Sequence, residues 1–216
     1  MNVAVSTNPK SRKVAERADR TRTTIVDSFI ALVKERQTSP TMPEVAQRAG
    51  VSLRSVYYHF RDTETLHAAV IARHEPLISQ MLVSLERAAP LRTRVRDLVA
   101  QRCEVYRLIA PLRRAVQSNN EVRNSPVIRS ARRRLEYVLA RHANETFASE
   151  LLDMPDRFGA SERIAAATSF EMWEHLSRVQ QLTPTRVEQH MIVSVDRKST
   201  RLNSSHEWIS RMPSSA

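Results

Sequence analysis

A short segment in the first third of the chain carries polar and aromatic side chains in a pattern suited to binding. Residues 41–60 read TMPEVAQRAGVSLRSVYYHF. A helix that follows Gly50 and buries Val56 and Phe60 leaves one face exposed. That face consists of Leu53, Arg54, Ser55, Tyr57, Tyr58 and His59. The major groove of DNA accepts such a helix, and residues near its N-terminus reach base edges. The pattern therefore indicates a helix that reads nucleic acid.

Two helices and a tight turn must position this face. Thr41 is a good N-cap for the first helix, with Pro43 just inside it and Glu44 three residues later. Gly50 ends that helix, since glycine adopts the positive φ that a tight turn needs. Ser52 caps the second helix. The spacing is that of a helix-turn-helix.

The sequence of this segment resembles that of a known family. The run A-G-V-S at 49–52, the block S-V-Y-Y-H-F at 55–60 and R-D-T-E-T-L at 61–66 are similar to the tetracycline-repressor (TetR) family of bacterial transcriptional regulators. The resemblance implies an all-α protein with an N-terminal three-helix DNA-binding domain and a C-terminal helical ligand-binding and dimerisation domain. It also implies a ligand-responsive repressor that binds a palindromic operator as a homodimer, without a cofactor and without enzymatic activity.

The resemblance assigns roles to single positions of the motif. Leu53, Arg54 and Ser55 occupy base-reading positions. Arg54 can bond guanine in a bidentate manner, and Leu53 can contact a thymine methyl group. The positions expected to contact phosphates are Thr41, Tyr57, Tyr58 and His59.

One position departs from the family pattern. The family often has a lysine at the start of the next helix, where this chain has Thr63. Its hydroxyl or the helix N-terminus can take over the backbone contact. Alternatively, nonspecific affinity is weaker, with Arg61 or the basic N-terminus compensating.

Large apolar residues of the second domain are candidates for a small-molecule pocket, since family members hold one among these helices. The candidates are Tyr106, Phe147, Phe170, Met172 and Trp173. A place in the core or in the dimer interface is the alternative for each of them. Dimerisation in the family uses the last two long helices, expected here at about 162–181 and 184–195.

Other chemistries find little support in the composition. The only glycines are Gly50 and Gly159, too few for a dinucleotide fingerprint, a Walker-type loop or a G-x-S-x-G elbow. The single cysteine, Cys103, permits no internal disulfide, and no apolar run is long enough for a transmembrane helix. We therefore expect a protein of the reducing cytoplasm.

Three further side chains are candidates for metal binding or redox sensing. His67 and His74 lie seven residues apart on one predicted helix, but a metal site needs more ligands than these, and none is evident. Cys103 qualifies as a redox sensor only if it is exposed near cations. A buried helical cysteine is the alternative.

The net charge of +11 leaves the class of partner open. A basic excess favours nucleic acid or an anionic membrane as the binding partner. The alternative is a basic surface that contacts only solvent. The competing hypothesis is a helical partner-binding or enzymatic module that uses its basic face without sequence-specific DNA binding.

The domain organisation follows from helical periodicity and proline punctuation. Residues 1–19 read as a flexible basic arm, 20–75 as the DNA-binding domain and 76–195 as a truncated C-terminal domain. Ile25, Phe29, Leu32 and Val33 predict a helix of about 20–36. The last 21 residues, 196–216, resemble the translation of a sequencing adapter, so we expect them not to be native protein.

Overall fold

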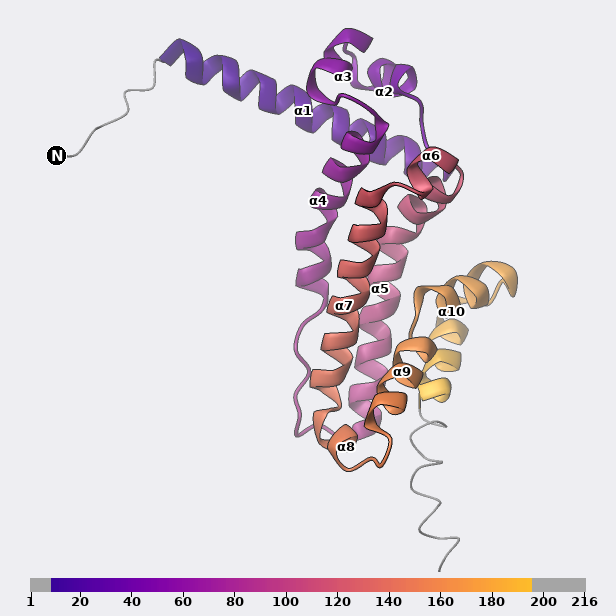
Figure 1. Ribbon diagram of the computed structural model, residues 1–216. Coiled ribbons are helices and arrows are strands. Elements are labelled where there is room, and N and C mark those ends of the chain that lie inside the picture. The colour runs from indigo at the N-terminus through magenta and orange to yellow at the C-terminus, as the bar shows by residue number, and fades with distance from the viewer. Residues whose placement is uncertain (1–8, 196–216) are drawn as a thin grey trace, which may run out of the picture. The chain divides into compact units, whose positions relative to one another are not determined.

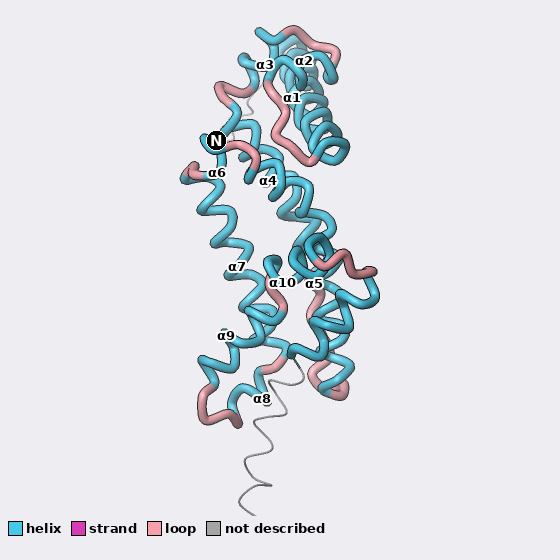
Figure 2. Tube along the Cα trace, turned by 90° about the vertical axis from the view of Figure 1, so that its right-hand side faces the viewer, coloured by secondary structure: helices cyan, strands magenta, loops and turns pink. Residues whose placement is uncertain are grey.

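The computed structural model describes residues 9–195, and its regular structure is helical throughout this range (Figures 1 and 2). The helices are α1 (Pro9–Arg36), α2 (Met42–Ala49), α3 (Leu53–His59), α4 (Thr63–Met81), α5 (Leu91–Gln117), α6 (Asn120–Arg123), α7 (Pro126–Thr146), α8 (Ala148–Leu152), α9 (Arg157–Ala167), α10 (Phe170–Glu174), the π-helix η1 (His175–Val179) and a helix over residues 184–195. The all-α fold class is confirmed. The expected tail at 196–216 lies outside the described residues, as do the first eight residues of the expected arm.

The described residues form two compact units, and three helices contribute to both. The first unit contains the chain up to Glu75 together with Pro111–Ala131, and the second contains Pro76–Ala110 and the chain from Arg132 onward. The sequence also predicts a boundary after residue 75, but it assigns 111–131 to the C-terminal domain. These residues fold with the first unit because Leu112 and Ala115 of α5 pack into its core.

Helix α1 begins earlier than the sequence pattern predicts. Its apolar face predicts a start near residue 20, whereas the helix begins at Pro9. Proline suits the first turn of a helix, and the helix formers Ala, Arg and Glu follow it. Arg12 and Glu16 add an ion pair at 3.3 Å, one turn apart. The expectation of a flexible arm is therefore wrong for residues 9–19, which are helical.

The core of the first unit joins the inner faces of α1, α2, α3 and α4, and α2 and α3 lie against α1 (Figure 1). The face predicted for α1 is buried, with Ile25, Phe29 and Val33 at 0% exposure. Val45 of α2, Val56 of α3 and Leu66 of α4 meet it from the other side. The N-terminal helices thus share one core, which fixes how α3 is presented.

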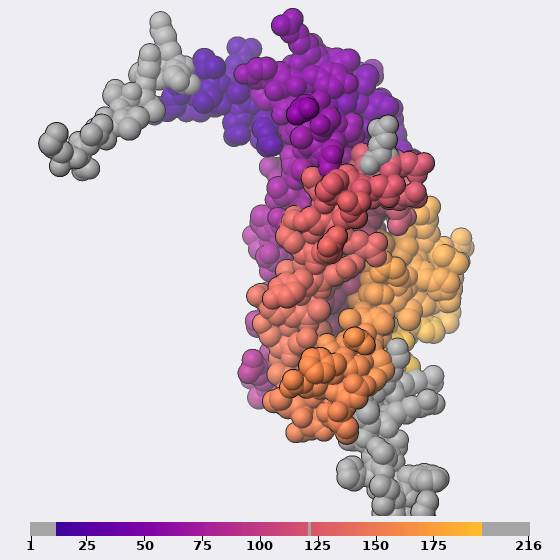
Figure 3. Space-filling model, viewed as in Figure 1, coloured from indigo at the N-terminus to yellow at the C-terminus, as the bar shows by residue number. Residues whose placement is uncertain are grey.

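The second unit has two hydrophobic clusters, both of which include residues of α5. One face of α5 carries an apolar stripe at helical spacing that includes one charged residue, Arg102, and the stripe is buried in full: Val95, Leu98, Val99, Arg102, Tyr106 and Ile109. One cluster joins α5 to α10, η1 and the helix over 184–195. The other joins α5 to α7, α8, α9 and Val195. The segments of α7, α8 and α9 lie next to one another on the surface in the space-filling view (Figure 3).

The helix expected at about 162–181 is broken at Thr168 and Ser169, between α9 and α10. The Ser169 hydroxyl caps α10 by accepting a hydrogen bond from the Met172 amide at 3.2 Å. The Tyr106 hydroxyl donates to the Thr168 carbonyl at 2.5 Å, so a carbonyl at the break is bonded by a side chain of α5. The prediction of one continuous helix is wrong because these local bonds stabilise a break.

Candidate nucleic-acid interface

Helix α2 starts with the capping box expected from the sequence. The Thr41 hydroxyl accepts from the Glu44 amide at 3.5 Å, and the Glu44 carboxylate accepts from the Thr41 amide at 2.8 Å. These bonds lower the pKa of Glu44, with a further contribution from Arg36. Two amides at the helix start are thereby bonded, and the entry of α2 is fixed.

The turn between α2 and α3 depends on Gly50, which has φ +66°, the left-handed conformation predicted for it. The Val51 amide donates to the Ala46 carbonyl at 3.1 Å and closes the end of α2. Ser52 then caps α3, since its hydroxyl accepts from the Ser55 amide at 3.1 Å. The chain reverses within a few residues, and α3 starts at a defined angle.

Helix α3 turns its apolar residues inward and its candidate contact residues outward. Val56 and Phe60 are 0% and 1% exposed. Among the candidates, Leu53, Tyr57 and Tyr58 are 39%, 50% and 82% exposed. Arg54 is exposed, whereas Ser55 and His59 are half-buried. The burial of Val56 and Phe60 and the exposure of Leu53, Arg54, Tyr57 and Tyr58 follow the expected pattern, whereas Ser55 and His59 are only half-exposed. The DNA contacts themselves stay predictions.

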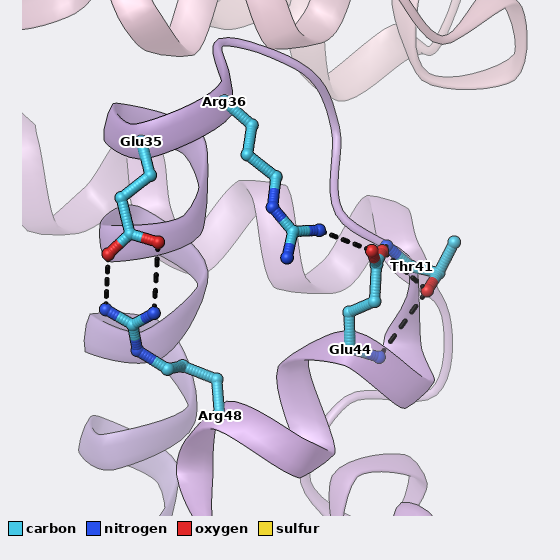
Figure 4. Close-up of polar contacts among 5 residues, drawn as sticks. All are labelled: Glu35, Arg36, Thr41, Glu44 and Arg48. Atoms are coloured by element: carbon cyan, nitrogen blue, oxygen red, sulfur yellow. Dashed lines mark hydrogen bonds and ion pairs between the residues drawn. The ribbon is translucent and has the colours of Figure 1, made fainter.

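Two ion pairs attach α2 to the end of α1 (Figure 4). Arg48 bonds both carboxylate oxygens of Glu35, at 3.0 and 2.5 Å, and Arg36 bonds Glu44 at 2.5 Å. The bond from Arg48 lowers the pKa of Glu35. Solvent screens exposed pairs of this kind, so they add little to the stability of the fold. Sequence reasoning missed them because each joins residues of two helices.

Two candidate phosphate contacts also serve the fold. The Thr41 hydroxyl donates to the Glu44 carboxylate at 2.8 Å, so its proton is already in use. Thr63 is the first residue of α4, and the cap of that helix is Asp62, which accepts from the Thr65 amide at 2.7 Å. The negative carboxylate of Asp62 already occupies the N-terminus of α4 and would repel a phosphate near Thr63.

The pocket candidates fall into two groups. Tyr106, Phe170 and Trp173 form one aromatic cluster with ring centroids 5.6 to 6.0 Å apart, and Met172 packs against the same cluster. Phe147 is buried in the other cluster of the second unit. The structure therefore brings four of the five candidates together. Their role as a ligand pocket stays a prediction.

The weaker candidates have structural partners. His67 lies 3.3 Å from the Ser39 hydroxyl, and the Nδ1 atom of His74 lies 2.8 Å from the Val70 carbonyl. Burial raises the pKa of Cys103 to about 12, which disfavours the reactive thiolate. Among residues 9–195, no three His, Cys, Asp or Glu side chains gather as metal ligands. The helices in this range also lack an apolar stretch that could span a membrane.

One buried charge was not foreseen as functional. Arg102 belongs to the apolar stripe of α5, and its exposure is 1%. Its Nη2 donates to the Leu139 carbonyl of α7, but Nε and Nη1 have no hydrogen-bond partner among the described residues. Helical spacing places this position among buried apolar residues, but the groups around its guanidinium come from helices far apart in the sequence.

Comparison with known proteins places these features in context. Residues 30–70 match the model of the bacterial regulatory proteins of the tetR family. The HTH-type transcriptional regulator SrpR of Pseudomonas putida is 35% identical over 69 residues, which are 31% of this chain and 32% of that protein. The chain thus matches about a third of the length of this relative.

Solved structures share the fold over most of the chain. A protein from Mesorhizobium loti assigned to the TetR-family regulators has a TM-score of 0.61 at 20% identity, covering 86% of this chain and 98% of its own. The flavonoid-responsive regulator FrrA has a TM-score of 0.59 at 21% identity, covering 85% and 97%. A transcriptional regulator from a Rhodococcus species has 0.62 at 17%, covering 85% and 96%.

These structural likenesses establish the fold alone, since each is below 25% identity. The family model and the relative SrpR add sequence matches. The family model covers the capped helix α2, the Gly50 turn and the outward face of α3. The segment that carries and presents α3 is therefore similar in sequence to the bacterial regulatory proteins of the tetR family.

Proposed function

We propose that this protein is a DNA-binding transcriptional regulator that acts by binding and not by catalysis. The observation that carries the proposal is the seating of α3, with Val56 and Phe60 buried while Leu53, Arg54 and Tyr58 face solvent. A helix presented in this way can enter the major groove with its first residues at the base edges. The matches to regulators of the tetR family support this assignment.

The regulator acts in the cytoplasm as a homodimer on a palindromic operator. Two copies related by a two-fold axis present two α3 helices about 34 Å apart, one turn of DNA. An effector among the helices of the second unit favours a dimer conformation in which the two α3 helices have a different spacing, and so weakens binding to the operator. It does so only to the extent that its affinity for the two conformations differs.

The experiment that tests the proposal is selection of bound sites from random DNA duplexes, followed by titration of the selected site. Arg54→Ala is expected to weaken binding by about 1–3 kcal/mol and to relax the base preference at one position of each half-site. Arg87→Ala is the matched control, since Arg87 is an exposed arginine of the second unit.

Two outcomes would overturn the proposal. The first is failure to select any preferred sequence. The second is an Arg54→Ala protein that binds like the control, which would favour the alternative of a helical module that uses its basic face for an acidic partner.

A further inference from the structure

Two buried arginines of the second unit differ in their surroundings, although both lie on α5. Arg94 is 5% exposed, and its guanidinium forms an ion pair with Glu150. It also donates to the carbonyls of Ala89 at 2.9 Å and Thr146 at 2.7 Å. Arg94 is therefore a structural cation with a carboxylate partner.

Arg102, about two turns further along α5, has no such partner. Its side chain donates only to the Leu139 carbonyl, and Nε and Nη1 are buried donors without an acceptor among residues 9–195. Burial lowers the pKa of Arg102 to about 10, so the group still carries its charge at neutral pH. A buried charge without a counter-ion destabilises a fold unless something else compensates it.

A histidine and a tyrosine lie close enough to this guanidinium to interact with its charge. The guanidinium charge contributes to lowering the pKa of His142, after burial, which is the larger cause. His142 bonds the Val83 carbonyl through Nε2 at 3.0 Å and leaves Nδ1 as a buried acceptor without a partner. Tyr106 follows one turn later on α5 and belongs to the aromatic cluster with Phe170 and Trp173.

We propose that Arg102 binds the carboxylate of a hydrophobic acid, which is the effector of this regulator, between α5 and α7. A carboxylate supplies the negative charge and the acceptor oxygens that this guanidinium lacks, since Nε and Nη1 still have hydrogens to donate. The aromatic residues suit an apolar body better than a free phosphate, which needs more donors than remain. The inference rests on the proposed function for its regulatory meaning, but its chemistry stands on Arg102 alone.

The burial of Arg102 connects binding to conformational change. At 1% exposure the guanidinium is inaccessible in this conformation, so an acid can reach it only if α5 and α7 move apart. The acid therefore binds a different conformation from the one described. This is the difference in affinity that a ligand needs in order to shift an equilibrium.

The test uses the full chain without DNA and measures binding by calorimetry. The probes are 2-naphthoate, 4-phenylbutanoate and decanoate, each paired with its neutral primary amide. At least one acid is expected to bind tenfold or more tightly than its amide. Arg102→Met should weaken that acid by about 10- to 100-fold and leave the amide unchanged, since hydrogen bonds to a charged group are lost. Arg102→Lys should keep the preference for acid over amide.

A second readout separates a ligand site from a structural arginine. Arg102→Met replaces an uncompensated buried charge with an apolar side chain, so its melting temperature should not fall. Arg94→Met is the matched control and should melt lower, because it leaves Glu150 without its partner. The inference is overturned if none of the acids binds, if acids and amides bind equally, or if Arg102→Met binds the acid like wild type or melts as low as Arg94→Met.

The outcomes distinguish this inference from the proposed function. If an operator is selected but no acid prefers Arg102, the regulator assignment holds and the anion site is wrong. If an acid binds through Arg102 but no DNA sequence is selected, the anion site is correct and the protein is not a DNA-binding regulator.

Discussion

At the scale of the residue, the main distinction is between side chains that face solvent and side chains whose polar atoms are already bonded. Tyr58 is 82% exposed, so it is available to a phosphate. The Thr41 hydroxyl instead donates to Glu44 within the capping box. A phosphate contact by Thr41 would have to displace this bond, whereas one by Tyr58 displaces only water. The family pattern treats the two positions alike, and the structure separates them.

His67 makes the stability of the first unit depend on pH. Burial lowers its pKa from 6.5 to about 4, so the unfolded chain takes up a proton in this range and the folded chain does not. The stabilisation is complete above pH 6.5 and is lost as the pH falls to about 4, amounting to up to about 3 kcal/mol. His67→Leu should flatten this dependence in urea unfolding measured from pH 7 to pH 4.5.

The flattening should be partial, because burial also lowers the pKa of His74 and His142. His190→Gln is the control, since that side chain is exposed on the helix over 184–195. A pH profile of His67→Leu that matches wild type would show that His67 does not titrate as its burial requires.

At the scale of the element, the helix-turn-helix depends on one backbone conformation. A Cβ added to Gly50 would meet no atom within 4 Å, so the cost of a side chain there is conformational alone. Gly50→Ala should therefore lower the free energy of unfolding by about 1–2 kcal/mol, the cost of a left-handed non-glycine residue. Gly50→Asn should cost less, because asparagine tolerates this region. Equal effects of the two substitutions in urea unfolding would contradict this account.

Local signals explain how much of the fold and site could be predicted from the sequence. Thr41 caps α2 through Glu44, three residues away, and Ser52 caps α3 through Ser55, also three residues away, while Gly50 sets the turn by its own φ. Because each of these signals is local, the caps and the turn were predictable. The break at Ser169 was not, because the Thr168 carbonyl depends on Tyr106, far away in sequence. The helical spacing of its apolar neighbours places Arg102 on the buried face of α5, but no local pattern reveals that its guanidinium lacks a carboxylate.

At the scale of the whole molecule, part of the positive charge behind the net +11 lies on an ordered helix, α1. The first turns of α1 extend beyond α2 and α3 (Figure 1), and the side chains of residues 12–17 are exposed. Lys13, Arg17 and Arg20 recur at helical spacing on this extension. A helix holds such a stripe in a fixed direction, which a flexible arm does not.

This placement predicts how binding depends on salt. Each phosphate neutralised by a cation releases counter-ions and contributes about 0.9 to the slope of log affinity against log salt. Replacing Lys13 and Arg17 with Gln should therefore reduce the slope by up to about 2 and weaken operator and random DNA alike, so that specificity is kept. Arg87→Gln should leave the slope unchanged. A loss confined to the operator would instead mean that the stripe reads bases, and an unchanged slope would mean that it lies away from the DNA.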